Sequence, residues 1–198
     1  MSQEPRKTAA GALLGAMVVV CAPAAFVQSG AVQSLTGMTA PRRSVLLAAS
    51  MALLAGPAAA EIDSVMGAPL STCSKPGMAM TGFTRDGHCQ DLGDDDAGSH
   101  HICIQMRPDF CTVTGQPNWC GKQMPCMGQA GNCPIGNWCV CQWAFARYIQ
   151  MAGGCDAIVD LQCDATNMAA MRAYEKEENA DKSIKDAITC LRQKCGLQ

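Results

Sequence analysis

The stretch Trp138-Cys-Val-Cys-Gln-Trp143, with the apolar run at 144–152 behind it, decides how we expect this chain to fold. It is the clearest strand candidate in the sequence, and the run that follows predicts a helix that ends at Gly153 and Gly154. Cys139 and Cys141 are two residues apart, so a strand would direct both thiols to the same face. The sequence therefore predicts a strand that leads into a helix and carries a pair of thiols.

Two other segments share this pattern. Residues 101–106 (HICIQM) and 157–163 (AIVDLQC) predict short strands, and each of the three strands contains a five-residue core with Gln in fourth place. The spacing between them is unequal, which excludes a repeat array. We therefore expect an α+β fold with a small sheet, helices on one face, many loops and disulfide staples.

The C-terminal third predicts two more helices. One covers residues 167–178, and the last runs over 181–194, with Asp181 as a cap and Gly196 at its end. The apolar residues of the last helix fall on one face, which predicts that this face packs on the domain. They are Ile184, Ala187, Ile188 and Leu191.

The remaining segments predict loops. Residues 61–100 are interrupted by Gly and Pro throughout. Residues 112–137 consist mostly of Gly, Pro, Asn and Cys, which predicts a long loop tied down by Cys120, Cys126 and Cys133. We place a disulfide-rich α+β domain at 61–175 and a helical extension at 176–198.

Residues 1–60 predict three targeting segments in series. Basic residues before an apolar run and a small-residue cut indicate a signal peptide at 1–25, and the Ser- and Thr-containing segment 26–41 is typical of plastid transit. Arg42 and Arg43 open a twin-arginine lumen-targeting signal at 42–60. The alternative is that either apolar run spans a membrane, but the second run is short and contains Pro57.

Such serial signals resemble the three-part presequences of algae with complex plastids, which lead into the thylakoid lumen. A secreted or periplasmic location is the alternative, although a periplasmic protein would need only the second signal. The net charge of the chain, −2, is too small to indicate a nucleic-acid partner. We expect a mature chain without a membrane span, in a plastid thylakoid lumen.

Cysteine is unusually frequent. Cys21 falls in the leader, which leaves thirteen of the fourteen cysteines in the mature chain, where large aromatic residues are few. This composition predicts disulfides, and the spacings fit zinc poorly because no Cys-x-x-Cys occurs. An odd number implies that at least one thiol is free, metal-bound or paired between chains, unless cleavage occurs elsewhere. The disulfide candidates are Cys73, Cys89, Cys103, Cys111, Cys120, Cys126, Cys133, Cys139, Cys141, Cys155, Cys163, Cys190 and Cys195.

Several motifs resemble a known family. They are MGAPLSTC (66–73), TGFTRDGHC (81–89), the acidic stretch 93–98 that leads into SHHICIQM (99–106), and NWCVCQW (137–143). In this order they are similar to the bacterial and plant family called domain of unknown function 2237, over residues of about 65–175. The resemblance implies a fold but no activity, and it implies family positions at Cys73, Cys89, Cys103, Cys139 and Cys141. The cysteine-rich loop 112–136, the Thr166-Asn167 pair and the tail depart from the family pattern.

Two constellations suggest chemistry. Cys139 and Cys141 could exchange as a redox dithiol, or each could pair with a different cysteine or be a buried thiol. His100 and His101, with Cys103, Met106 and the acidic run 94–96, could bind copper or zinc. The alternative is a solvent-facing histidine beside an Asp-rich turn, because adjacent histidines on a strand point to opposite faces. Our prediction is that the chain holds no metal.

Two further groups are open to more than one interpretation. Arg85 and Asp86 are expected to form a turn and an ion pair rather than a catalytic site. A loop cluster is either an exposed protein-binding patch or a miniature core. Its residues are Trp119, Met124, Pro125 and Met127.

We therefore expect a non-catalytic, disulfide-stabilised lumenal protein without a cofactor. Its expected role is that of a peripheral subunit or assembly factor of a photosystem or its antenna, so its partner is a membrane protein complex. The alternatives are a lumenal thiol-redox enzyme or sensor that uses Cys139 and Cys141, or a metal-binding protein.

Overall fold

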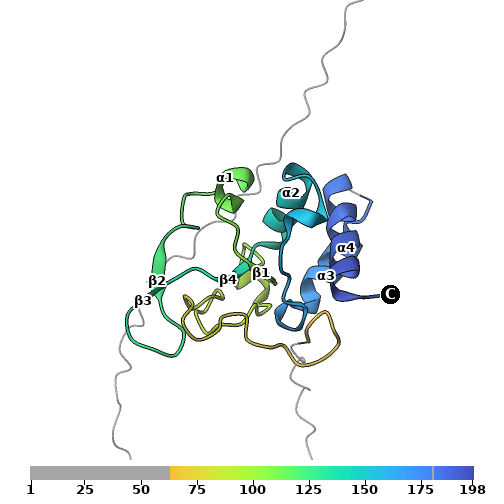
Figure 1. The fold of residues 1–198 in the computed structure, drawn as a ribbon. Helices are drawn as coiled ribbons and strands as arrows, with labels where there is room; N and C mark the ends of the chain where they lie inside the picture. The colour runs from red at the N-terminus through yellow and green to blue at the C-terminus, as the bar shows by residue number, and fades with distance from the viewer. Residues whose placement is uncertain (1–62, 180) are drawn as a thin grey trace, which may run out of the picture.

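Two short antiparallel strands lie at the centre of the fold (Figure 1). The computed structural model describes residues 63–179 and 181–198, so the predicted targeting segments lie outside the described residues. Strand β1 (Ile102–Gln105) pairs with β4 (Asn137–Val140), with Ile102 opposite Val140 and Cys103 opposite Cys139. Every residue of β4 is buried. The strand predicted at 101–106 is confirmed.

On the outer edge of each strand, one backbone amide donates a hydrogen bond to a threonine hydroxyl. The backbone N–H of Cys103 donates to Oγ1 of Thr166 at 3.1 Å, and that of Cys139 donates to Oγ1 of Thr81 at 2.8 Å. These two amides therefore point away from each other, which makes Cys103 and Cys139 a non-hydrogen-bonded pair with closely spaced side chains.

The third predicted strand, 157–163, is wrong as a regular strand. The segment touches β1 through a single bridge between Ile104 and Leu161, and 3-10 turns at Cys155–Ala157 and Cys163–Ala165 flank it. Ile158 and Leu161 are buried whereas Val159 is 57% exposed. Buried positions thus recur at a spacing of three residues, which a strand with its period of two cannot provide.

The helical predictions hold, with one shift at the first helix. Helix α2 (Gln142–Met151) begins two residues after β4 ends, and Cys141 is its N-cap residue. The predicted strand over 138–143 therefore ends at Val140, and Cys141 does not continue it. Helices α3 (Met168–Lys176) and α4 (Lys182–Cys195) are capped by Asn167 and Asp181, whose side chains accept from backbone amides.

The helices form the main hydrophobic core against the sheet. Phe145, Tyr148 and Ile149 of α2 and Leu191 of α4 are at most 1% exposed. Each such side chain contributes about 1.5–3 kcal/mol through burial. In Figure 1 the helices α2, α3 and α4 gather on one side of β1 and β4, as expected for an α+β fold with helices on one face.

The segment predicted as a long loop, 112–137, is more regular than expected. It includes most of α1 (Phe110–Thr114) and a hairpin of β2 (Gln123–Pro125) and β3 (Asn132–Pro134). The hairpin lies at the opposite end of the body from α4 (Figure 1). By contrast, residues 63–100 contain only isolated bridges and a 3-10 turn at Gly93–Asp95, as predicted.

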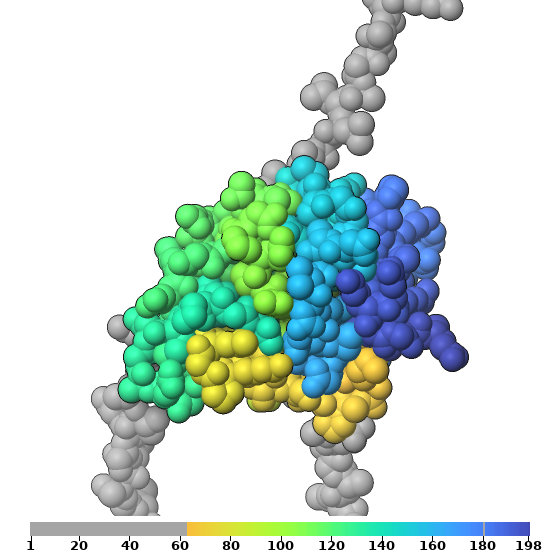
Figure 2. All heavy atoms as spheres, viewed as in Figure 1, coloured from red at the N-terminus to blue at the C-terminus, as the bar shows by residue number. Residues whose placement is uncertain are grey.

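Figure 2 shows residues 63–100 along one edge of the body and α4 on the adjoining side. Within the described ranges, no helix combines the length and the apolar character needed to cross a membrane.

Candidate functional site

Four buried cysteines form one cluster beside the sheet, which we call the inner cysteine cluster. They form two disulfides, Cys73–Cys103 and Cys89–Cys139. The Sγ atoms of Cys73, Cys89 and Cys103 all lie within 4.8 Å of one another. All four residues are at most 2% exposed. Two residues of a loop and two facing residues of a sheet thus bring their sulfurs to one place.

The loop that carries Cys73 and Cys89 has its own hydrogen bonds. The amide of Cys73 donates to the carbonyl of Gly87 at 2.8 Å, and the amide of Thr81 donates to Oγ of Ser74 at 2.8 Å. Gly82 has a φ of 88°, and a Cβ atom there would lie 2.5 Å from the carbonyl oxygen of His88. The turn therefore requires glycine at position 82, and the TGF motif supplies it.

Four other disulfides that join described residues lie outside the cluster. Cys111–Cys120 and Cys126–Cys133 close short loops, and Cys155–Cys190 and Cys163–Cys195 fasten α4. Twelve of the predicted cysteines are thus in these six bonds. The thirteenth, Cys141, is 2% exposed, and none of the described cysteines is free.

The predicted redox pair is separated in the structure. Cys139 lies on β4 and is bonded to Cys89, whereas Cys141 caps α2 and its carbonyl accepts from the amide of Phe145. Their thiols therefore do not share the face of one strand, because the strand ends between them. For Cys139 the geometry fits the alternative in which each of the two pairs with a different cysteine, because its partner is Cys89.

The predicted metal ligands are also dispersed. Cys103 is bonded to Cys73, and Asp94 and Asp95 are exposed in the 3-10 turn. His100 Nδ1 lies 2.7 Å from Oδ1 of Asp96. Met106 is partly buried and packs on the main core.

Both histidines instead make contacts within the fold. His101 is 6% exposed, its Nδ1 lies 2.8 Å from Oε1 of Gln142, and its Nε2 lies 3.6 Å from Asp91. Asp96 is 1% exposed. Burial raises the pKa of Asp96, but hydrogen bonds and charge from His100, with a bond from the Gly98 amide, outweigh it and lower the pKa overall.

The TRDG turn brings together groups that sequence reasoning did not connect. Thr72 Oγ1 lies 3.4 Å from Nε2 of His88, whose Nδ1 is 3.7 Å from Asp86. Asp86 also accepts from the backbone amide of His88 and from the side chain of Gln90. Because Thr72 is far from this turn in sequence, no spacing signal points to the contact.

Arg85 forms the turn as predicted, with a φ of 58°. Its guanidinium carbon lies 4.9 Å from the ring centroid of Trp138, a cation–π contact in place of the expected ion pair with Asp86. Burial lowers the pKa of Arg85.

The predicted binding patch is divided between surface and core. Trp119 is partly buried, and its Nε1 donates to Gln116. Its ring centroid lies 5.7 Å from that of Trp138, with the two rings tilted by 35°. Met124 also packs against the core, whereas Pro125 is exposed on β2 and Met127 is half-buried beside Gly87. Two members of the group therefore contribute to the core.

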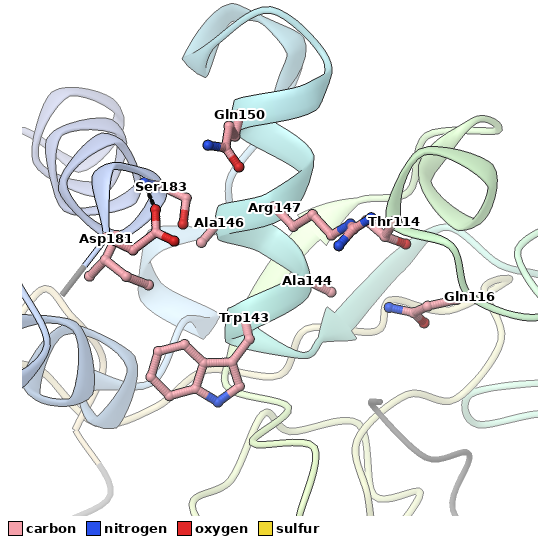
Figure 3. Close-up of a pocket in the computed structure, with 10 residues that line it drawn as sticks. Thr114, Gln116, Trp143, Ala144, Ala146, Arg147, Gln150, Asp181 and Ser183 are labelled. Atoms are coloured by element: carbon pink, nitrogen blue, oxygen red, sulfur yellow. Dashed lines mark hydrogen bonds between the residues drawn. The ribbon is translucent and has the colours of Figure 1, made fainter. Parts of the chain in front are cut away.

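A pocket of about 210 Å³ lies between α1, α2 and the start of α4 (Figure 3). Arg147 reaches from α2 toward Thr114, and Trp143 closes another side. Asp181 is the N-cap of α4, and its Oδ1 accepts a hydrogen bond from the backbone amide of Ser183 at 2.7 Å. The pocket residues are Thr114, Gln116, Trp143, Ala144, Ala146, Arg147, Gln150, Asp181, Ser183 and Ile184.

A family described as "uncharacterized protein conserved in bacteria (DUF2237)" matches residues 63–180. The match covers more than half of the chain, so the chain belongs to this family. The comparison with curated proteins finds no match. Helix α4 lies entirely beyond the matched range, whereas the inner cysteine cluster lies within it.

Proposed function

We propose that this DUF2237 protein is a non-catalytic, disulfide-stabilised protein of the thylakoid lumen. In this proposal it serves as a peripheral lumenal subunit, or an assembly and stabilising factor, of a photosystem or its antenna. The observation that carries the proposal is the spread of six disulfides over the described chain. Disulfides form and persist in oxidising compartments, and the predicted leader at 1–60 is of the lumen-targeting type.

A binding role suits a body of this kind. Covalent links keep the loops in place before a partner arrives, so little ordering is needed on binding. The histidines of the chain are engaged within the fold: His88 with Thr72, His100 with Asp96 and His101 with Gln142. This use of the titratable groups supports a structural role rather than a catalytic one.

Fractionation of thylakoids tests the proposal. The full chain, with a C-terminal tag, should be protected from protease in intact thylakoids and should migrate with a photosystem or antenna complex on native gels. A matched variant, Arg42→Lys with Arg43→Lys, should accumulate outside the lumen because the twin-arginine signal is lost. Absence of the wild-type protein from purified photosystem I, photosystem II and antenna complexes would refute the proposed partner.

Thiol redox activity is the second candidate, and the inner cysteine cluster favours it. Cys139 is bonded to Cys89, so exchange would pass through this disulfide rather than through a bond between Cys139 and Cys141. Mass mapping before and after mild reduction decides the matter. If neither Cys139 nor Cys141 changes its state, the redox function is excluded.

A further inference from the structure

We propose that the inner cysteine cluster is also a metal site, which binds one zinc ion after both of its disulfides have been reduced. In the described part of the chain, it contains the only group of three or more Cys, His, Asp or Glu residues whose ligand atoms lie close enough together to hold an ion. The inference does not depend on which partner the protein has, and it requires conditions that reduce both disulfides.

Three of the four sulfurs already lie near one another in the oxidised protein. A Zn–S distance of about 2.3 Å separates neighbouring sulfurs by about 3.8 Å. In the oxidised protein, the Sγ atoms of Cys73, Cys89 and Cys103 lie within 4.8 Å of one another, and Cys139 is bonded to Cys89. Once reduction has broken both bonds, the sulfurs of each former disulfide must move apart, and the sulfur of Cys139 must join those of the other three cysteines. Rotation about the side-chain bonds permits both movements and would complete the site.

Backbone contacts also bring these side chains together, in addition to the disulfides. Cys103 and Cys139 face each other across β1 and β4, and the hydroxyls of Thr166 and Thr81 fix the outer edge of each strand. The loop that carries the other two cysteines is closed by the bond from the Cys73 amide to the Gly87 carbonyl. Zinc binding would therefore be coupled to re-formation of contacts that already exist in the oxidised fold.

The donor set selects the ion and the type of site. Four thiolates are soft ligands, which favour zinc over magnesium or calcium. A complete set of four protein ligands leaves no open position for water or substrate, which is the arrangement of a structural rather than a catalytic zinc site. The burial of all four cysteines, at most 2% exposed, agrees with this type. The other described disulfides offer their sulfurs in pairs, which is half of such a set.

Reduction of the cluster and binding of zinc are two separate steps. Each of the two disulfides accepts two electrons and two protons from a dithiol reductant, which is itself oxidised to a disulfide. The four protein thiols that result release four protons when they bind one Zn²⁺ ion. The cluster would thus cross-link the loop to the sheet in both states, through sulfur bonds when oxidised and through zinc when reduced.

Metal titration of the full chain tests this inference. The protein is treated with a phosphine reductant, which reduces the disulfides, and is then refolded with Zn²⁺ or with Co²⁺ as a spectroscopic probe. We expect about one equivalent of zinc per chain, and charge-transfer and visible bands of tetrahedral cobalt bound to sulfur. A variant with Cys73→Ser and Cys89→Ser, which removes one sulfur of each inner disulfide, should lose this binding. The matched control, Cys126→Ser with Cys133→Ser, should retain it.

A second measurement on the wild-type chain guards against a variant that fails to fold. Zinc-loaded and zinc-free reduced protein are alkylated, and the modified cysteines are mapped by mass spectrometry. Zinc should protect the four inner cysteines and leave the thiols of the other described disulfides reactive. Protection of a different set, uniform protection, absence of bound zinc, or equal binding by the Cys73→Ser and Cys89→Ser variant would overturn the proposal.

Discussion

The loop-rich segment 63–100 and helix α4 are each attached to the rest of the protein by two disulfides, but in different structural settings. The segment has little regular structure, and its disulfides reach buried positions on β1 and β4. Helix α4 is capped at both ends and buries an apolar face. Disulfides therefore replace secondary structure in the first region and reinforce it in the second.

This difference predicts how much of the protein should unfold when the disulfides of each region are removed. The four bonds close loops of similar length, with separations of 30 and 50 residues in the first region and 35 and 32 in the second. Loop closure alone would assign each of them about 3.5–4 kcal/mol. Because the entropic contribution of the four bonds is nearly the same, the two regions should differ in where unfolding occurs when their bonds are removed.

The largest effect should come from replacing the four inner cysteines by alanine, under oxidising conditions. Two lost disulfides remove about 7 kcal/mol, which is comparable to the whole stability of a domain. We expect no cooperative unfolding transition by circular dichroism in denaturant. The control Cys126→Ala with Cys133→Ala, whose bond spans 7 residues, should cost only about 2 kcal/mol. An inner variant that unfolds at the wild-type denaturant midpoint would contradict the comparison.

A smaller and local effect is expected when the four cysteines of the α4 bonds are replaced by alanine. Ile184, Ile188 and Leu191 still bury the apolar face of α4, so the rest of the domain should stay folded. Hydrogen exchange should become faster in α4 by orders of magnitude, while protection in β1 and β4 changes little. Equal loss of protection in α4 and in the sheet would show that the two regions unfold as one unit.

Acid should weaken the first region before the second. The pKa of Asp96 is lower in the folded protein than its usual value of 3.8. The ionised side chain therefore contributes fully to the free energy of unfolding above pH 3.8, and this contribution is lost as the pH falls through the lower pKa of the folded state. The buried carboxylate accepts bonds from His100 and from the amide of Gly98, together worth about 2 kcal/mol.

The variant Asp96→Asn tests this dependence. It should be less stable at neutral pH and should lose less stability than the wild type in this acidic window. Denaturant titrations at a series of pH values measure the difference, with Asp94→Asn as a matched control because Asp94 is exposed in the same turn. Parallel pH curves for the wild type and Asp96→Asn would count against the assignment.

The sequence predicted α3 and α4 well because each has a cap residue and a helical pattern of apolar positions. It failed at Cys141, because a strand that passes directly into a helix has no Gly or Pro at the boundary. It failed at 157–163 because an apolar, β-branched run does not reveal the 3-10 turns on both sides. The regular structure within 112–137 was missed because its helix and strands are only three to five residues long.

For the candidate site, the sequence predicted which cysteines form disulfides but not how they pair. Composition identified the cysteines as disulfide partners, but the pairing depends on which segments meet in three dimensions. Cys73 bonds to Cys103 across 30 residues, whereas Cys89, which is closer to Cys103 in the sequence, bonds to Cys139. The register of β1 against β4 places Cys103 opposite Cys139, and the path of the loop sets which of its two cysteines meets each of them.

The smallest loss of stability is expected when the residues that cap the helices are replaced. Asp181 caps α4 from an exposed position, and it accepts from the amide of Ser183. Replacement by alanine should cost about 1 kcal/mol, and Asp181→Asn should restore most of it. Because disulfides hold α4 at Cys190 and Cys195, we expect faster exchange only in the first turn of the helix.

The cap of α3 is the matched case. Asn167 is 4% exposed, caps α3 through the amide of Ala169, and donates to the carbonyl of Cys89 at 3.1 Å. Asn167→Ala should therefore cost more than Asp181→Ala, because it also leaves a buried carbonyl beside the inner cluster without this donor. Denaturant unfolding of the two alanine variants measures the difference. If Asp181→Ala proved the more costly, the distinction between a region held by buried polar contacts and one held by its own helix would fail.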